Sequence, residues 1–214
     1  MEYFNHYKLH FSNKSFLHAL LVAALLFSTS LILNYFASTY ATKEASGSVT
    51  DIILSNTSVH DVDGIFVYGT YALLALILFI ILSKLNTLPF VIEAIALFYM
   101  IRSIFMSLTH IGPFPTQMSI SSDLFSKLNF GGDLFFSGHT GLPFLMALIF
   151  WHVPRVRYVF LCFSAALGAV VLMGHLHYTI DVASAFFITY GIFHIARFLF
   201  RSEYELFCNG ILKQ

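Results

Sequence analysis

The chain has 214 residues, of which 58% are hydrophobic and only 10% are charged, a composition that excludes an ordinary water-soluble domain. Its formal net charge is zero, so no overall basic charge favours nucleic acid as a partner. We therefore expect an integral membrane protein.

Six long apolar runs predict transmembrane helices, because about 20 apolar residues are needed to cross the hydrocarbon core. The runs are continuous rather than alternating, which favours a helical bundle over a closed β-barrel. No internal repeat or flexible linker divides the chain, so we expect one all-α domain over residues 1–214. In chain order, the six predicted spans are residues 16–36, 65–83, 88–108, 134–151, 156–173 and 178–200.

Lysine and arginine are distributed unequally between the two sides of this predicted bundle. The long connections at residues 37–64 and 109–133 carry only Lys43 and Lys127. By the positive-inside rule, both termini face the cytosol and the long connections face the outside or a lumen. The side with the termini and the short turns carries Lys8, Lys14, Lys84, Arg155, Arg157, Arg197, Arg201 and Lys213.

Ionisable residues within the predicted spans are expected at one depth, on the side of the long connections. Arg102 lies near the end of the third predicted helix, His139 opens the fourth, and segment 175–181 joins the fifth to the sixth. Because such residues are costly near a bilayer, their convergence predicts a functional site. The candidate catalytic motifs thus fall within residues 100–190.

His177 and Asp181 are four residues apart, a spacing that places two side chains on one face of a helix. The carboxylate could then accept a hydrogen bond from one imidazole nitrogen and leave the other nitrogen reactive. An imidazole held in this way suits a nucleophile or a general base. A polar helix cap is the alternative interpretation of the same pair.

Ser137, Gly138 and His139 stand at the predicted start of the fourth helix. Backbone N–H groups and the positive end of the helix dipole suit this place to a phosphate, and glycine allows a close approach. A histidine here could protonate a leaving oxygen. Taken alone, the same residues also fit an ordinary serine-initiated helix with an interfacial histidine.

Three further residues are candidates for substrate contacts. Arg102 could bind a phosphate, or its side chain could extend to the membrane interface. Asp133 could assist His139, bind a cationic head group, or be only a loop acid. His175 could contact the substrate or, with the histidine and aspartate that follow it, supply ligands to a metal.

Two segments, GGDLFFSGHT (131–140) and HLHYTIDVASAFFITY (175–190), together resemble the sphingomyelin synthase branch of the type-2 phosphatidic acid phosphatase superfamily. The likeness extends to MIRSIFMSLTHIGPFP (100–115), which is similar to that family's arginine- and serine-containing helix end and proline-containing loop. It covers roughly the C-terminal half of the chain by motif, and the family's six-helix layout agrees with the expected fold.

The resemblance implies a catalytic role for three residues. His177 would attack a lipid phosphodiester and carry the head-group phosphate covalently, as a phosphohistidine. Asp181 would orient and stabilise His177. His139 would act as general acid for the departing diacylglycerol and then as general base for the incoming alcohol. No metal and no other cofactor is implied.

The implied reaction moves phosphocholine or phosphoethanolamine from a glycerophospholipid to ceramide or a similar lipid alcohol. Its partners would be the phospholipid donor, a lipid acceptor such as ceramide or diacylglycerol, and the membrane. The wider superfamily has a Ser-Arg pair before the second histidine, where this chain has Val170 and Val171. A phosphomonoester dianion needs such a cation more than a diester monoanion does, so this difference favours a diester substrate.

Two other functions are compatible with the sequence. One is a lipid phosphate phosphatase or phospholipase C-type hydrolase of the same superfamily, in which water replaces the alcohol. The other is a non-catalytic transporter or lipid-binding scaffold, in which the polar residues line a pathway. The intact set of two histidines and an aspartate argues against the non-catalytic role.

The expected location is a membrane, with the active site on the non-cytosolic face. A compact chain without a recognisable appended soluble domain favours a bacterial inner membrane, with a secretory-pathway or plasma membrane as the alternative. A homo-oligomer is compatible with the sequence, which leaves the oligomeric state open.

Overall fold

The computed structural model describes residues 11–120 and 135–210, and this part of the chain is built from helices and their connections. Two short 3-10 turns, η1 (Leu54–Asn56) and η2 (Leu85–Thr87), precede α3 and α4 respectively. The α-helices are α2 (Lys14–Lys43), α3 (Asp63–Ser83), α4 (Leu88–Leu108), α6 (Gly138–Ile149), α7 (Pro154–Met173), α8 (Thr179–Leu199) and α9 (Arg201–Asn209).

Five of the described helices, α2, α3, α4, α7 and α8, are long and apolar enough to cross a membrane. The prediction of an all-α polytopic membrane protein is therefore confirmed in its architecture. The prediction of six spans is not confirmed, because the helix within the fourth predicted span, α6, has only 12 residues. Such a helix is about 18 Å long, well short of the hydrocarbon thickness.

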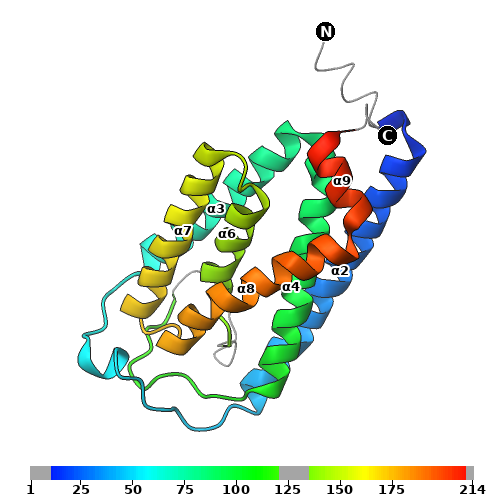
Figure 1. Ribbon diagram of the computed structural model, residues 1–214. Helices are drawn as coiled ribbons and strands as arrows, with labels where there is room; N and C mark the ends of the chain where they lie inside the picture. The colour runs from blue at the N-terminus through cyan, green and yellow to red at the C-terminus, as the bar shows by residue number, and fades with distance from the viewer. Residues whose placement is uncertain (1–10, 121–134, 211–214) are drawn as a thin grey trace.

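The two ends of the bundle differ in which segments they contain. Figure 1 shows the start of α2 and helix α9 at one end, and the connection from α2 to α3 at the other. The chain that follows α4 and the turn between α7 and α8 also lie at this second end. Both long connections thus begin on one side, as expected, and which side faces the cytosol stays a prediction.

Helix α6 lies inside the bundle, where it packs against α7, α8 and α4. Nine of its twelve residues are buried. A helix that begins and ends within a membrane protein is tolerated where protein rather than lipid surrounds its termini. The short length of α6 therefore places its N-terminus inside the bundle, at the depth where the polar residues gather.

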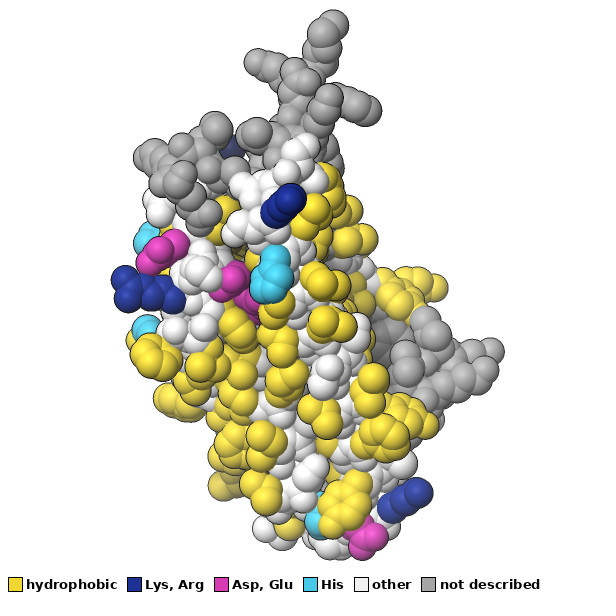
Figure 2. Space-filling model, turned by 90° about the vertical axis from the view of Figure 1, so that its right-hand side faces the viewer, with side chains coloured by type: hydrophobic (Ala, Val, Ile, Leu, Met, Phe, Trp, Pro, Cys, Tyr) yellow, Lys and Arg dark blue, Asp and Glu magenta, His cyan; other side chains and the backbone are white. Residues whose placement is uncertain are grey.

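The outer helices present apolar side chains to their surroundings. Figure 2 shows hydrophobic side chains over the middle of one face, with most of the charged side chains and histidines toward its two ends. Exposed examples are Leu25 and Phe36 on α2, Phe79 on α3 and Phe187 on α8. This distribution is typical of a surface in contact with lipid.

Small residues bring α2 and α4 close together. Ala23, Ser30, Ala37 and Ala41 of α2 are buried, and the two helices make the most extensive contact between any pair of described elements. Small side chains allow helix backbones to approach closely in a membrane. The contact fixes α4, which carries Arg102, against the rest of the bundle.

Candidate active site

The start of α6 is joined directly to the first turn of α8. Ser137 is the N-cap of α6, and its Oγ accepts hydrogen bonds from the backbone N–H of Thr140 (3.4 Å) and from the Thr140 hydroxyl (3.2 Å). The backbone N–H of Ser137 donates to the carbonyl oxygen of Asp181 (3.1 Å). This link holds the segment that carries His139 beside the segment that carries His177.

The pair His177 and Asp181 is formed at a helix cap rather than along a helix face. His177 precedes α8, which begins at Thr179. Asp181 Oδ2 accepts a hydrogen bond from the backbone N–H of Tyr178 (2.9 Å) and lies 3.6 Å from Nδ1 of His177. The helix-cap interpretation is therefore realised, and the capping carboxylate also lies beside the histidine. The catalytic interpretation stays a prediction. The on-helix geometry was wrong, since His177 has not yet entered the helix.

The two candidate catalytic histidines lie next to each other although they come from different elements. The ring centroids of His139 and His177 are 6.4 Å apart, with the planes inclined at 56°. The ring of Phe66, on α3, packs against His139 with a centroid distance of 4.5 Å. At this separation both imidazoles can reach the oxygens of a single phosphoryl group.

Arg102 is buried at the start of α6 and does not extend to the membrane interface. Its Nε donates to the carbonyl oxygen of Phe136 (2.9 Å), and its Nη1 donates to Oδ1 of Asn34 (3.4 Å). A Cβ added at Gly138 would lie 3.4 Å from Arg102 Nε. The guanidinium thus packs against the backbone of the helix start, where its charge adds to the helix dipole.

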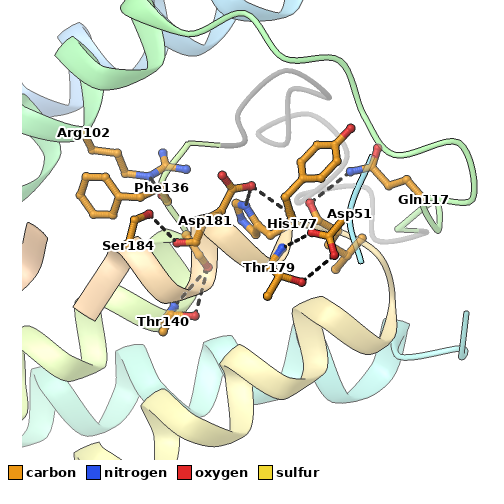
Figure 3. A network of polar contacts seen from close by, with 12 residues as sticks. Asp51, Arg102, Gln117, Phe136, Thr140, His177, Thr179, Asp181 and Ser184 are labelled. Atoms are coloured by element: carbon orange, nitrogen blue, oxygen red, sulfur yellow. Dashed lines mark hydrogen bonds and ion pairs between the residues drawn. The ribbon is translucent and has the colours of Figure 1, made fainter. Parts of the chain in front are cut away.

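In Figure 3, His177 lies beside Asp181, with Arg102 on one side of the pair and Asp51 on the other. The sequence predicts that Arg102, Ser137, Gly138, His139, His177 and Asp181 lie together, and the fold brings them to one end of the bundle. Asp133, which was expected among them, falls outside the described residues.

His175 occupies a different position from the other candidates. Its Nδ1 lies 2.6 Å from the hydroxyl of Thr116, its Nε2 lies 3.4 Å from the hydroxyl of Thr57, and the ring of Phe114 packs on it. Burial lowers the pKa of this histidine below its ordinary value. With both nitrogens facing threonines, His175 connects the two long loops to the turn before α8.

The metal alternative needed His175 together with His177 and Asp181. Within residues 11–120 and 135–210, no group of three or more His, Cys, Asp or Glu side chains is arranged to hold a metal ion. The ring nitrogens of His175 face threonine hydroxyls that belong to the long connections. The arrangement therefore suits His175 to fixing loops better than to ligating a metal beside His177.

Asp51 is a site neighbour that sequence analysis missed. Its carboxylate accepts hydrogen bonds from the backbone N–H (2.7 Å) and the hydroxyl (2.8 Å) of Thr179, the first residue of α8. It also accepts from the backbone N–H groups of Ile53 and Leu54. Burial alone would raise the pKa of Asp51, but these hydrogen bonds outweigh it and hold the pKa below its ordinary value.

Tyr178 is the second residue that the sequence did not reveal. It is almost completely buried, its hydroxyl donates to the carbonyl oxygen of Gly112 (2.8 Å), and it accepts from the backbone N–H of Val49 (3.2 Å). One side chain next to His177 is thus tied to both long connections. No local pattern distinguishes it from the other ten tyrosines.

Residues 131–198 match the family model described as PAP2 superfamily C-terminal. The matched segment contains His139, His177 and Asp181, and it ends before α9. This match supports the type-2 phosphatidic acid phosphatase superfamily and does not distinguish between its branches. Among curated proteins and among solved structures, none matches this chain.

Proposed function

We propose that this protein is a membrane phosphotransferase that moves the head-group phosphate of a glycerophospholipid to a lipid alcohol through a phosphohistidine on His177. The superfamily match suggests a phosphoryl-transfer or hydrolase enzyme in a membrane. The observation that carries the proposal is the approach of His139 to His177 at the start of α6, with Asp181 behind one ring and Arg102 beside the helix start.

In the first step His177 is the nucleophile. Its Nδ1 faces the carboxylate of Asp181, so Nε2 is the nitrogen that we assign to the attack on phosphorus. A bond forms between this nitrogen and phosphorus while the bond from phosphorus to the diacylglycerol oxygen breaks. Protonated His139 gives its proton to the departing oxygen, and Asp181 stabilises the positive charge that develops on His177.

In the second step the hydroxyl of the acceptor lipid attacks the phosphohistidine. Neutral His139 removes the proton of that hydroxyl as the new oxygen–phosphorus bond forms and the nitrogen–phosphorus bond breaks. His139 is then protonated and His177 is regenerated, so the cycle consumes no net proton. The products are diacylglycerol and the acceptor lipid with its new head group.

The transition state carries negative charge on the phosphoryl oxygens. Arg102 is held in place by Phe136 and Asn34, and its guanidinium packs beside Gly138. The N-terminus of α6 adds backbone N–H groups and the positive end of its dipole. A preorganised cation and a helix start in a buried site can stabilise this charge without rearrangement during the reaction.

The side chains behind the site support two parts of the proposal, a phosphodiester donor and transfer rather than hydrolysis. Val170 and Val171, which stand where the superfamily has a Ser-Arg pair, are buried in an apolar cluster with Phe66, Leu176 and Val182. No cation in this cluster would serve a phosphomonoester dianion, and its apolar side chains limit water near the phosphohistidine. Ceramide as the acceptor and phosphocholine or phosphoethanolamine as the head group belong to the proposal through the sequence resemblance.

The test uses purified protein in lipid nanodiscs that contain phosphatidylcholine and phosphatidylethanolamine, with labelled ceramide or labelled diacylglycerol as acceptors. Product lipids are separated and identified by mass spectrometry, for the wild type, for His177→Ala and for His60→Ala. His60 is an exposed histidine on the connection between α2 and α3, which makes it a matched control. We expect a labelled lipid with a new head group from the wild type and His60→Ala only.

Other results would redirect the assignment. Diacylglycerol together with the free phosphorylated head group, and no modified acceptor, would identify the hydrolase. Turnover that survives in His177→Ala would reject the phosphohistidine. The complete absence of turnover with every donor and acceptor would move the assignment to the non-catalytic scaffold.

A further inference from the structure

The far end of α8 carries a second polar region that the proposed reaction does not use. Arg197 lies 18 residues after Thr179, about 27 Å along the helix. Here the C-terminal part of α8 meets the end of α6 and helix α9, and the three elements enclose a surface pocket of about 330 Å³. Its polar and aromatic lining includes Trp151, His152, Tyr190, His194, Arg197 and Tyr204.

Aromatic rings hold the cation of this pocket in place. The guanidinium of Arg197 lies 4.5 Å from the ring centroid of Tyr204 and 5.6 Å from that of Phe193. Cation–π contacts of this kind position a guanidinium without neutralising its charge. Tyr204 is itself fixed by its contact with Phe90 of α4 (4.9 Å).

Arg197 is the charged residue of the pocket lining. The nearby Arg201 forms an ion pair with Glu205 (3.0 Å) on the exposed side of α9. Within the part of the chain that the structure describes, Arg197 forms no ion pair, and none of the residues that line the pocket is acidic. Glu205 lines an adjoining hollow that shares His194, Arg197 and Tyr204, but its carboxylate is paired with Arg201. His152 and His194 add imidazole N–H groups to the same wall. The pocket therefore presents one uncompensated positive charge and several hydrogen-bond donors.

The surroundings of the pocket are those of a membrane interface. Phe198, Leu199 and Ile195 are exposed on the neighbouring faces of α8, where apolar side chains meet lipid tails. Trp151 and Tyr190 at the rim are aromatic residues with polar groups, which membrane proteins concentrate at the level of the head groups. A ligand here would have its charged group in the pocket and its apolar part beside α8.

We propose that this pocket binds the phosphate group of an anionic phospholipid, in the leaflet opposite to His139 and His177. A basic pocket between membrane helices, with aromatic residues at the head-group level, has the chemistry that recognises such lipids. The uncompensated charge of Arg197 favours an anionic lipid over a zwitterionic one. A bound lipid would contact the end of α8, helix α9 and the end of α6 at the same time. Such a lipid would be bound in addition to the lipid substrates of the proposed reaction.

The experiment compares lipid retention by three forms of the protein. Wild type, Arg197→Gln and Arg155→Gln are purified in nanodiscs of phosphatidylcholine with or without phosphatidylglycerol, and the retained lipids are counted by native mass spectrometry. Arg155 is an exposed arginine at the same end that does not line the pocket, so it controls for the loss of one charge. We expect Arg197→Gln to retain about five-fold less phosphatidylglycerol than the other two forms.

Two further measurements keep the proposal testable if Arg197→Gln does not fold. Arg197→Lys keeps the charge and should retain most of the phosphatidylglycerol. Phosphatidylglycerol with a photoreactive head group should cross-link to the wild type within residues 148–204, at positions that line the pocket. Equal retention by wild type and folded Arg197→Gln, or cross-links only at the end that holds His177, would overturn the proposal.

A soluble anion is the other source of the same chemistry. Inorganic phosphate is therefore added to the wild type in nanodiscs of pure phosphatidylcholine, and its binding is measured by calorimetry. We expect no saturable binding that depends on Arg197. Phosphate binding that Arg197→Gln abolishes, without any preference for phosphatidylglycerol, would assign the pocket to a soluble phosphate and reject the lipid.

Discussion

The two ends of α8 use polar residues in opposite ways. At its start, Asp51, Tyr178 and Asp181 are buried, and each makes hydrogen bonds of defined geometry. At its end, Arg197 and His194 are exposed and are placed by aromatic rings rather than by hydrogen bonds. A buried network of hydrogen bonds suits the fixed geometry of a reaction, whereas an open pocket suits reversible binding of a mobile lipid head group.

The buried hydrogen bonds at the start of α8 also explain how His177 is held in place although it precedes the helix. The two residues that follow His177 are fixed by contacts with the long connections, Tyr178 through Gly112 and Val49, and Thr179 through Asp51. A side chain on such a fixed segment loses little entropy when it reacts. The segment from His177 to Asp181 is therefore the region where substitutions should have the largest effects on activity.

The largest effect is expected for His177→Ala. Without a nucleophile no phosphohistidine forms, so turnover should fall at least about 1,000-fold, while the folded structure is kept. Lipid products in nanodiscs measure the first quantity and thermal unfolding measures the second. A variant that unfolds at a much lower temperature would show that the loss of activity has a structural cause.

The next largest effect is expected for Asp181→Asn, which separates the cap from the orientation of His177. The amide oxygen can still accept the hydrogen bond from the backbone N–H of Tyr178, but the negative charge near His177 is lost. We expect kcat to fall about 100-fold or more, with a small change in Tm. Activity close to that of the wild type would mean that Asp181 serves only as a helix cap.

A smaller effect on activity is expected for Gly138→Ala. The new Cβ would lie 3.4 Å from Nε of Arg102 and would stand at the start of α6, where a phosphate is expected to approach. We expect kcat/KM to fall about ten-fold, with little loss of stability, because the backbone needs no unusual conformation at this position. Gly191→Ala, at an open position of α8, is the matched control.

Asp51→Ala tests the hydrogen-bond network at the start of α8 by its effect on the stability of the protein rather than on the reaction. The substitution leaves the N–H groups of Thr179, Ile53 and Leu54 without this acceptor, and the bond to Leu54 is buried, so we expect a loss of about 2–3 kcal/mol in the free energy of unfolding. Because Asp51 takes no part in the proposed chemistry, activity should fall only if the start of α8 becomes more mobile. Denaturation in detergent, followed by circular dichroism, measures the difference from wild type.

The stability difference between wild type and Asp51→Ala should also depend on pH. The folded-state pKa of Asp51 lies below its ordinary value of 3.8, so its contribution is complete above that value and is lost as pH falls through the folded-state pKa. The stability difference between wild type and Asp51→Ala should therefore be constant near neutral pH and shrink in acid below 3.8. A difference that grows in acid would contradict this assignment.

Much of the fold could be predicted because the apolar runs are long and continuous. The predicted span 88–108 coincides with α4, whereas α2 continues to Lys43, seven residues beyond its predicted end. Its last turns are kept helical by small residues such as Ala37 and Ala41, which are buried in the bundle. The hydropathy of a segment does not predict packing of this kind between helices.

The length of α6 was missed for a related reason. The run that predicted a span over residues 134–151 begins with Leu134 and two phenylalanines, but the helix starts only at Gly138, after the cap at Ser137. A side chain that caps the backbone, rather than the hydropathy of the run, decides where this helix begins. The resulting short helix is what places His139 inside the bundle.

The site was predictable to the extent that its chemistry is local in sequence. Their catalytic roles stay a prediction, but His177, Asp181 and the serine, glycine and histidine at 137–139 were identified as candidates from spacing and motif. Asp51 and Tyr178 were not, because their contacts join residues 128 and 129 positions apart in the sequence. Contacts at such separations are set by the packing of the long connections, which leaves no periodic signal in the chain.

The most direct test of the central claim is to look for the covalent intermediate itself. Wild-type protein in nanodiscs is given a phospholipid donor without any acceptor, digested at alkaline pH, and analysed by peptide mass spectrometry. We predict a peptide that carries the head-group phosphate on His177, and its disappearance when a lipid alcohol is added. Turnover in the same preparation without any adduct on His177, or with the adduct on His139 instead, would contradict the mechanism.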